Sequence, residues 1–339
     1  MEQRIRVFMK RVSKLGLVLL LIVNVSVIAQ TSELTGFFDA INSYNLTNSE
    51  TNGFHINQFE IDIEYTYNDK LSIGGAVAYN NESGNMELAV ANIHYNLLGH
   101  GDYHTRGAET IGHLALNVGQ NDVAFGLDYL LLPSPDRTVI SPPIVVEKTI
   151  GGWNDIGINL HGIMSVFSFD LNVVNGFNDG INLGGKISIS PLDGFRIGVS
   201  HASDFASMDD RNNWVTGTNI MWANSNFEIK SEYLMATGLL DGEQDALGTD
   251  EISDGFYVQG IMYTKELIDL PFFVTLRYGQ WNLDGDRNLN GINDTQDRFS
   301  FGVGYQIMES FSLRSEYLYD KFDNDETDHT IAIQAVVTF

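Results

Sequence analysis

The last ten residues, Thr330-Ile331-Ala332-Ile333-Gln334-Ala335-Val336-Val337-Thr338-Phe339, decide the fold. Every second residue counted back from Phe339 is apolar, and the other register carries Thr330, Gln334 and Thr338. This alternation of period two predicts a β-strand with one dry face and one wet face. The edge of such a strand must pair with another strand, and closing the sheet into a barrel pairs it without leaving an edge elsewhere. We therefore expect this stretch to be the closing strand of a barrel.

A final strand that alternates in this way and ends in Phe resembles the C-terminal insertion signal of Gram-negative outer-membrane β-barrels. The resemblance implies a location in the bacterial outer membrane and contact with outer-membrane lipid. It also implies that the barrel-assembly machinery recognises the last strand.

The N-terminal residues carry an export signal. Five basic side chains fall within residues 1–14, and residues 15–29 form an apolar run that ends in Val27-Ile28-Ala29. This order is typical of a secretory signal peptide, so we expect residues 1–29 to be removed after Ala29. The alternative, an N-terminal membrane anchor, needs about 20 apolar residues. No later apolar run is long enough for a spanning helix, so residues 30–339 can cross a membrane only as a barrel.

The composition excludes one class of partner. The 339 residues carry a formal net charge of −25, from 44 acidic and 19 basic residues, and include no Cys. A strongly acidic chain is repelled by phosphate backbones, so nucleic acid is not an expected partner. The lack of Cys excludes disulfides, which suits a chain that crosses the periplasm unfolded.

Alternation recurs along the chain, for example over residues 59–67. Short turns such as Pro191–Gly194 and Ile307–Ser310 alternate with long polar loops such as 240–255 and 282–298. The pattern predicts an all-β chain folded as a single transmembrane antiparallel barrel of about 16 strands (range 16–18), with short periplasmic turns and long external loops. A barrel of this width leaves an aqueous lumen, so the apolar faces must point outward to lipid.

Two groups of charged residues fall on the wet faces of the predicted strands. The acidic group consists of Glu60, Asp62 and Glu64, and the basic group consists of Lys186, Arg196, Lys230, Arg277 and Arg314. We predict that both groups line the pore on opposite walls, where they set up a transverse field that sorts ions. The alternative is that they are ordinary solvated charges. Acidic neighbours of the basic group, Glu228, Glu232 and Glu316, weaken any preference for anions.

Two short motifs resemble phosphate-selective (O/P-type) and related porins of Gram-negative bacteria. The first is Gly119–Asp128, in which Asn121 and Ala124 stand where the family has Phe and Pro, and the second is the Asn-Gly strand end in Val173–Phe177. The resemblance implies a porin, and porins of this size are often trimers, so it implies a homotrimer. It also implies a long loop that folds inward and narrows the lumen.

Residues 130–148 are the candidate for this constriction loop. The stretch contains four Pro residues, which stiffen it and remove backbone N–H donors. We predict that Asp136, Arg137 and Lys148 sit at the constriction. The alternative is an external surface loop.

The stretch 286–297 has the spacing of a calcium-binding loop. Gly291 would permit the sharp turn, and the ligands would be Asp286, Asn288, Asn290, the carbonyl of Ile292, Asp294 and Asp297. The stretch ends in Asp where the EF-hand has Glu, and it resembles the calcium loops of dockerins and thrombospondin-type repeats. The alternative is a solvated loop rich in Asn, Asp and Gly. A bound Ca²⁺ would have a structural role, and no cofactor is required for the main function.

These observations predict a passive or weakly selective diffusion channel for small hydrophilic solutes or ions. One alternative is an outer-membrane enzyme of the lipase or protease type, with His201 and Ser203 or His104 and Asp102 as candidates. The sequence has no nucleophile–base–orienter motif, so we do not expect an enzyme. Further alternatives are a transporter for apolar ligands, for which the N-terminus is too short to form a plug, and a surface adhesion or structural barrel. The acidic loops are also candidates for binding divalent cations that bridge lipopolysaccharide phosphates.

Overall fold

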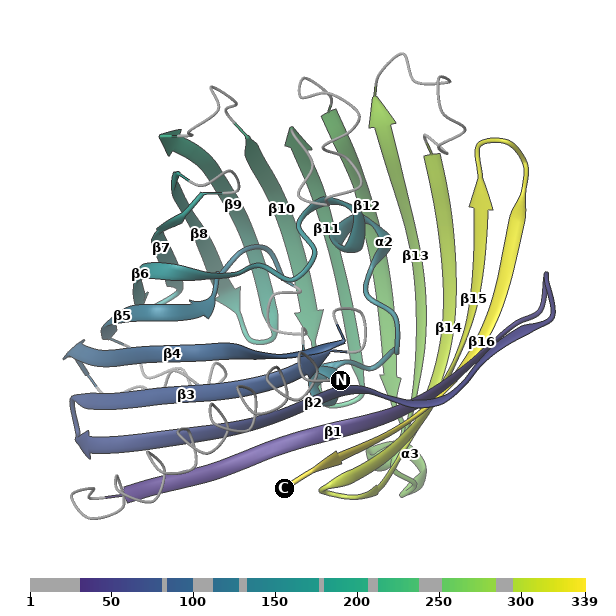
Figure 1. Cartoon of the computed structure of the whole chain (residues 1–339), viewed down its shortest axis with the longest axis horizontal. Coiled ribbons are helices and arrows are strands. Elements are labelled where there is room, and N and C mark those ends of the chain that lie inside the picture. Colours follow the sequence, from purple (N-terminus) through teal and green to yellow (C-terminus); the bar gives the residue numbers. More distant parts are fainter. Residues whose placement is uncertain are drawn as a thin grey trace, which may run out of the picture.

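The computed structural model describes residues 31–80, 84–99, 112–127, 133–176, 180–206, 213–237, 252–284 and 295–339. Within these residues, 16 strands form one closed antiparallel barrel, and each strand pairs with its neighbours in the chain (Figure 1). The strands are β1 (Thr31–Asn45), β2 (Glu50–Asn68), β3 (Leu71–Asn80), β4 (Asn85–Leu98), β5 (His113–Asp122), β6 (Asn154–Met164), β7 (Phe167–Asn175), β8 (Ile181–Leu192), β9 (Phe195–Ala206), β10 (Trp214–Ala223), β11 (Phe227–Thr237), β12 (Ile252–Tyr263), β13 (Phe272–Asp284), β14 (Thr295–Met308), β15 (Phe311–Phe322) and β16 (Thr327–Thr338). The prediction of an all-β barrel of about 16 strands is confirmed.

The predicted closing strand, β16, pairs with β1. Ala335 faces Ala40 and Ile333 faces Asn42 across this seam. Beyond the strand end, the backbones of Gly36 and Phe339 exchange two hydrogen bonds of 3.0 Å. The seam is therefore hydrogen-bonded up to the last residue of the chain.

The apolar side chains of the strands point outward. In β16, Ile333 is 53% exposed and the adjacent Gln334 is 1% exposed; in β7, Leu171 is 50% exposed and the adjacent Asn172 is 3% exposed. This order is the reverse of a water-soluble protein. It is the pattern of a barrel whose outer surface meets lipid and whose interior is polar.

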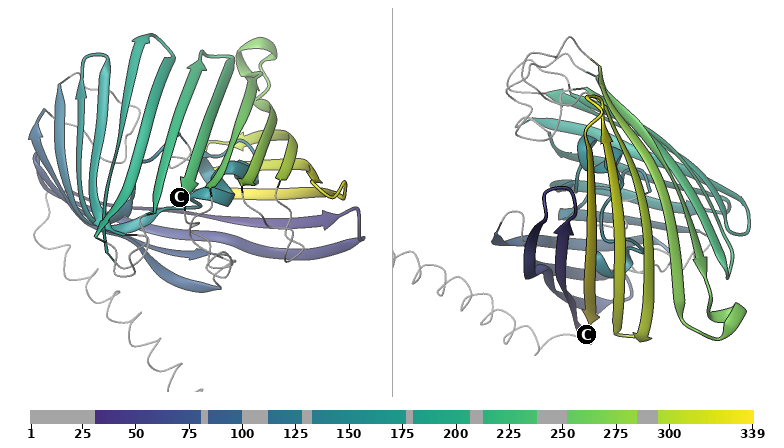
Figure 2. Two further views of the ribbon diagram at one scale, coloured as in Figure 1. Left: turned by 90° about the horizontal axis from the view of Figure 1, so that it is seen from above. Right: turned by 90° about the vertical axis from the view of Figure 1, so that its right-hand side faces the viewer.

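The two ends of the barrel differ. We call the end at which β1 begins and β16 ends the turn end. There β2 joins β3 at 69–70, β8 joins β9 at 193–194, and β14 joins β15 at 309–310. A short helix, α3 (Lys265–Ile268), connects β12 to β13 at the same end (Figure 2). No helix in the described part of the chain has the length and apolar character needed to cross a bilayer.

The opposite end, which we call the loop end, has short connections that depart from the predicted alternation. Residues 323–326 join β15 to β16, and residues 46–49 join β1 to β2. The side-chain oxygen of Asn45 accepts hydrogen bonds from the backbone N–H groups of Thr47 (2.9 Å) and Asn48 (3.1 Å). An Asn that binds the backbone two residues further on favours a tight turn, so this connection needs no long loop.

Candidate functional site

The described residues of the connection between β5 and β6, 123–127 and 133–153, fold into the barrel, and we call them the inward segment. The backbone N–H of Val123 donates to the carbonyl of Trp153 (2.9 Å), so the two ends of the segment lie together. Between them are a short 3-10 helix, η2 (Ser134–Asp136), and a helix, α2 (Ile144–Thr149).

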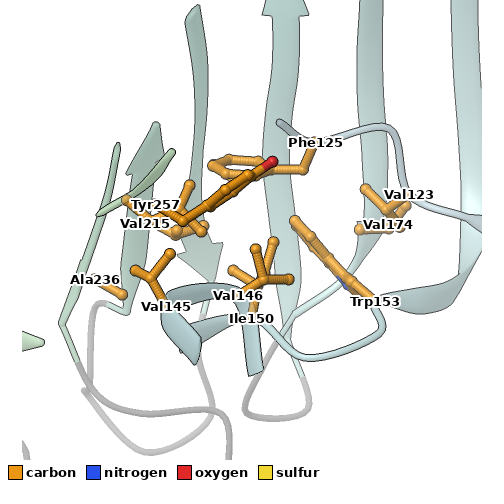
Figure 3. Close-up of a cluster of buried hydrophobic side chains, with 12 residues drawn as sticks. Val123, Phe125, Val145, Val146, Ile150, Trp153, Val174, Val215, Ala236 and Tyr257 are labelled. Carbon is orange, nitrogen blue, oxygen red and sulfur yellow. The ribbon is translucent and has the colours of Figure 1, made fainter. Parts of the chain in front are cut away.

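An apolar cluster (Figure 3) fixes α2 against the inner wall of the barrel, where α2 contacts β11, β12 and β13. Val145 and Val146 of α2 are 0% and 3% exposed. The cluster also includes Val123, Phe125, Ile150, Trp153, Val174, Ala202, Val215, Leu234, Ala236 and Tyr257. Burial of large apolar side chains contributes about 1.5–3 kcal/mol each. The inward segment therefore has its own small core inside the lumen.

The first arm of the inward segment, 123–127, is held by three inward side chains. Lys186 of β8 donates to the carbonyl of Gly126, and Ser200 of β9 accepts from the N–H of Gly126 (3.0 Å). Glu232 of β11 accepts from the N–H of Leu127 (3.0 Å). Gly126 has φ +63°, and a Cβ there would lie 1.9 Å from the Oε1 atom of Glu232. Only Gly fits this position, because it must be both left-handed and in contact with the carboxylate.

The second arm is held by Glu316 of β15. Its Oε2 atom accepts the N–H groups of Ile140 (2.8 Å) and Ser141 (2.7 Å), and its Oε1 atom accepts the Ser141 hydroxyl (2.7 Å). Arg277 of β13 lies 3.6 Å from the same carboxylate and donates to the Ser141 carbonyl (3.0 Å). Arg314 of β15 donates to the carbonyls of residues 134 and 135. Glu316 and Arg277 therefore form a buried ion pair, and all three side chains are hydrogen-bonded to the inward segment.

The predicted basic residues face inward, but most of them do not line open water. Lys186 and Lys230 are each 5% exposed, Arg277 is 3% exposed and Arg314 is 6% exposed. The prediction that these four residues line the pore stays a prediction, because Arg277 also lines the second of the two cavities described below. Lys186, Arg277 and Arg314 donate to carbonyls of the inward segment, and the Nζ atom of Lys230 lies 3.8 Å from the Glu228 carboxylate.

The remaining predicted cations are more accessible. Arg196 is half-buried on the inward face of β9, and Lys148 is half-buried in the last turn of α2. Arg137 follows η2, and its guanidinium donates to the Ile140 carbonyl (3.1 Å) and to the side-chain carbonyl of Gln58 (2.9 Å).

The predicted acidic residues share one cavity of about 670 Å³, which we call the acidic cavity. Its carboxylates come from β1, β2, the inward segment and the β14–β15 turn, and they are Glu33, Glu60, Asp62, Glu64, Asp136 and Glu309. Among the described residues that line it, none is Lys or Arg. On β3, the register partners of the three β2 acids are Ala78, Ala76 and Gly74, which leave room beside the carboxylates.

A second cavity of about 540 Å³, which we call the mixed cavity, lies further toward the loop end along the same wall. Gln58, Arg137, Glu147 and Arg277 line it. The short stretch 134–137 therefore separates two cavities along β1, β2 and β16.

A ladder of buried polar side chains occupies the inward face of β4–β7. The Nδ1 atom of His94 lies 2.7 Å from the Asn117 side-chain oxygen, Asn117 donates to Asn159 (3.2 Å), and Asn159 donates to Asn172 (2.8 Å). All four are at most 8% exposed. Sequence reasoning missed this ladder, although polar residues at every second position of these strands were its signal.

The predicted calcium-loop residues from 286 to 294 lie outside the described residues. Asp297 lies in β14 and accepts a hydrogen bond from the Tyr278 hydroxyl (2.8 Å). In the described ranges, no group of three His, Cys, Asp or Glu side chains is arranged to hold a metal ion. The calcium site stays a prediction.

Of the residues named for a catalytic alternative, the structure describes His201 and Ser203, both in β9. His201 is exposed on the outward face of β9, where its Nδ1 atom lies 2.7 Å from the Thr216 hydroxyl. His104 and Asp102 lie outside the described residues.

No family model matches this sequence, and no curated protein matches it. Solved structures do match its fold. It is similar to OmpF of Salmonella typhi in complex with daunomycin, with a TM-score of 0.67, 12% identity, and coverage of 91% of this chain and 97% of that one. It is also similar to the anion-selective porin of Comamonas acidovorans (TM-score 0.64, 8% identity, coverage 91% and 99%) and to OmpT of Vibrio cholerae in its trimer form (TM-score 0.60, 10% identity, coverage 91% and 99%). The phosphate-selective (O/P-type) assignment within this fold stays a prediction. The chain has the 16-strand barrel fold of outer-membrane porins.

Proposed function

We propose that this protein is an outer-membrane channel through which small hydrophilic solutes or ions diffuse passively. One observation carries the proposal: a barrel with an apolar outer surface holds two cavities, of about 670 and 540 Å³, on either side of an inward segment. A path along β1, β2 and β16 would connect them. Such a path needs no reaction and no cofactor.

The lining charges favour cations on this path. Lys186, Arg277 and Arg314 of the wall bind carbonyls of the inward segment, whereas Glu60, Asp62 and Glu64 line the acidic cavity. Removing one unit charge about 10 Å from a path through water changes the local concentration of a monovalent ion by about twofold. Several carboxylates on one path should therefore give a clear preference for cations.

The reversal potential of the purified protein in a planar bilayer, under a potassium chloride gradient, tests both steps. We expect discrete current steps and a reversal potential on the cation side. Changing Glu60, Asp62 and Glu64 together to Gln, Asn and Gln should move the reversal potential toward the anion side. The matched control removes three carboxylates from the distant β15–β16 connection, at Asp323, Asp325 and Glu326.

The two steps fail in different ways. Absence of current steps from correctly folded protein would refute the channel itself. Current steps whose reversal potential is the same in the triple variant and the control would refute only the cation preference.

We also propose that the barrel assembles as a homotrimer in contact with outer-membrane lipid and lipopolysaccharide. The similar OmpT structure is described in a trimer form, and the outward apolar faces are suited to lipid or to a second copy. Light scattering of the detergent-solubilised protein tests the assembly, and a monomer mass would refute it.

A further inference from the structure

The strand β2 contains a bulge directly beside the inward segment. The register between β1 and β2 pairs Phe38 with Phe59 and then Ala40 with Ile56. Asp39 of β1 is therefore opposite two residues of β2, Asn57 and Gln58. A bulge turns a side chain in a new direction, and bulges are frequent beside functional sites.

Asp39 braces this bulge from the interior. It is 0% exposed, and its carboxylate accepts the backbone N–H of Gln58 (2.6 Å) and the side-chain amide of Asn57 (3.2 Å). The side-chain amide of Gln334 donates to the same carboxylate. The bulged backbone is therefore fixed by a buried charge rather than by the strand ladder alone.

The bulge directs the Gln58 side chain at the tip of the inward segment. Its Oε1 atom accepts from the backbone N–H of Ser134 and from the guanidinium of Arg137, both at 2.9 Å. A second guanidinium nitrogen of Arg137 donates to the Ile140 carbonyl (3.1 Å). Arg137 lines the mixed cavity and the adjacent Asp136 lines the acidic cavity, so the guanidinium is held at the boundary between the two.

We propose that Gln58 is a positioning residue for ion selectivity: it holds the Arg137 guanidinium at the junction of the two cavities. There the guanidinium opposes the carboxylates of the acidic cavity and limits the preference for cations. The proposal rests on the channel function proposed above. Gln58 acts through Arg137, so the two residues should not have independent effects on selectivity.

Reversal potentials of three variants test this coupling. Arg137→Gln removes the charge, and the potassium-to-chloride permeability ratio should rise by about fourfold, twofold from each ion. Gln58→Leu removes the acceptor and leaves the charge, and it should raise the same ratio by a smaller factor because the guanidinium leaves the junction. The double variant should match Arg137→Gln alone.

Gln259→Leu is the matched control. Gln259 of β12 is another wall glutamine that contacts the inward segment, through a hydrogen bond from its amide to the Thr138 hydroxyl (3.2 Å). This variant removes a tether of the same kind that does not hold Arg137, so its permeability ratio should equal that of the unchanged protein.

Each outcome decides the proposal. An unchanged ratio in Gln58→Leu, or additive effects in the double variant, would overturn it, and so would a shift of equal size in the Gln259→Leu control. Should Gln58→Leu lose the heat-modifiable gel mobility of a folded barrel, Gln58→Met takes its place, since it keeps the length and lacks the acceptor. Loss of current in the unchanged protein would instead refute the channel function.

Discussion

Replacing Glu316 by Ala should release the inward segment from the wall and leave the barrel closed. The Glu316 carboxylate is buried, at 2% exposure for the residue, and it accepts the N–H groups of Ile140 (2.8 Å) and Ser141 (2.7 Å). It also lies 3.6 Å from Arg277. Removing one partner of a buried, hydrogen-bonded charge pair costs about 3–5 kcal/mol, because the groups left behind stay desolvated. This cost falls on the docking of the segment, since the backbone ladders of β15 do not involve the side chain.

Hydrogen exchange of the Ile140 and Ser141 amides measures this docking. Each 1.4 kcal/mol is about a factor of ten, so exchange of both amides in Glu316→Ala should speed up by roughly a hundredfold to a few thousandfold, while amides in the centre of β15 stay protected. Glu316→Gln keeps an oxygen acceptor and should lose only about 1 kcal/mol. Ser312→Ala, on the same buried face of β15, is the control. Unchanged exchange of both amides in Glu316→Ala would refute the argument that this carboxylate anchors the segment.

Three further predictions concern other parts of the chain. Gly126→Ala should lower the free energy of unfolding by about 1–3 kcal/mol, because the new Cβ would lie 1.9 Å from a carboxylate oxygen. Gly53→Ala is the control, since Gly53 has the same left-handed backbone but no atom within 4 Å of the added Cβ. Equal losses of unfolding free energy for the two variants in urea denaturation would contradict the clash. Ile333→Arg, on the outward face, should lower the free energy of unfolding in lipid vesicles by about 2–4 kcal/mol near the membrane midplane. Thr330→Arg, at the mixed cavity, should leave this free energy unchanged. The opposite order of the two variants would contradict an apolar outward face. Calorimetry should detect Ca²⁺ binding that Asp286→Ala abolishes, and absence of heat at about millimolar calcium would remove that proposal.

The barrel could be predicted because each strand separately needs one apolar face toward lipid and one polar face toward the interior, and this requirement produces the alternation of period two. The same alternation placed Arg277 and Arg314 correctly on the inward faces of β13 and β15. It could not show that they are covered, because periodicity reports the direction of a side chain and not what packs against it. What packs against them depends on the inward segment, which is held by contacts between residues far apart in the sequence.

The bulge at Gln58 did leave a signal in the sequence. Outward apolar residues of a regular strand are an even number of positions apart. Ile56 and Phe59 are three positions apart, yet both line the same pocket on the outer surface. A shift of this kind marks an extra residue in a strand. It could not indicate the partner, because Arg137 lies 79 positions away in the sequence.

The direction of the anchoring hydrogen bonds has a cause in the composition of the inward segment. Pro has no N–H, so a segment with Pro at four positions between 133 and 143 offers more carbonyl acceptors than donors. Acceptors need donors on the wall, and Arg277 and Arg314 supply them to the carbonyls of Ser141, Ser134 and Pro135. The guanidinium groups of Arg277 and Arg314 are therefore bound to the segment, and Arg277 also lines the mixed cavity, while the carboxylates of β1 and β2 face the acidic cavity. The N–H donors of the segment bind two wall carboxylates, Glu232 and Glu316, so its hydrogen bonds engage charges of both signs on the wall, and the acidic cavity is lined by the carboxylates of β1 and β2.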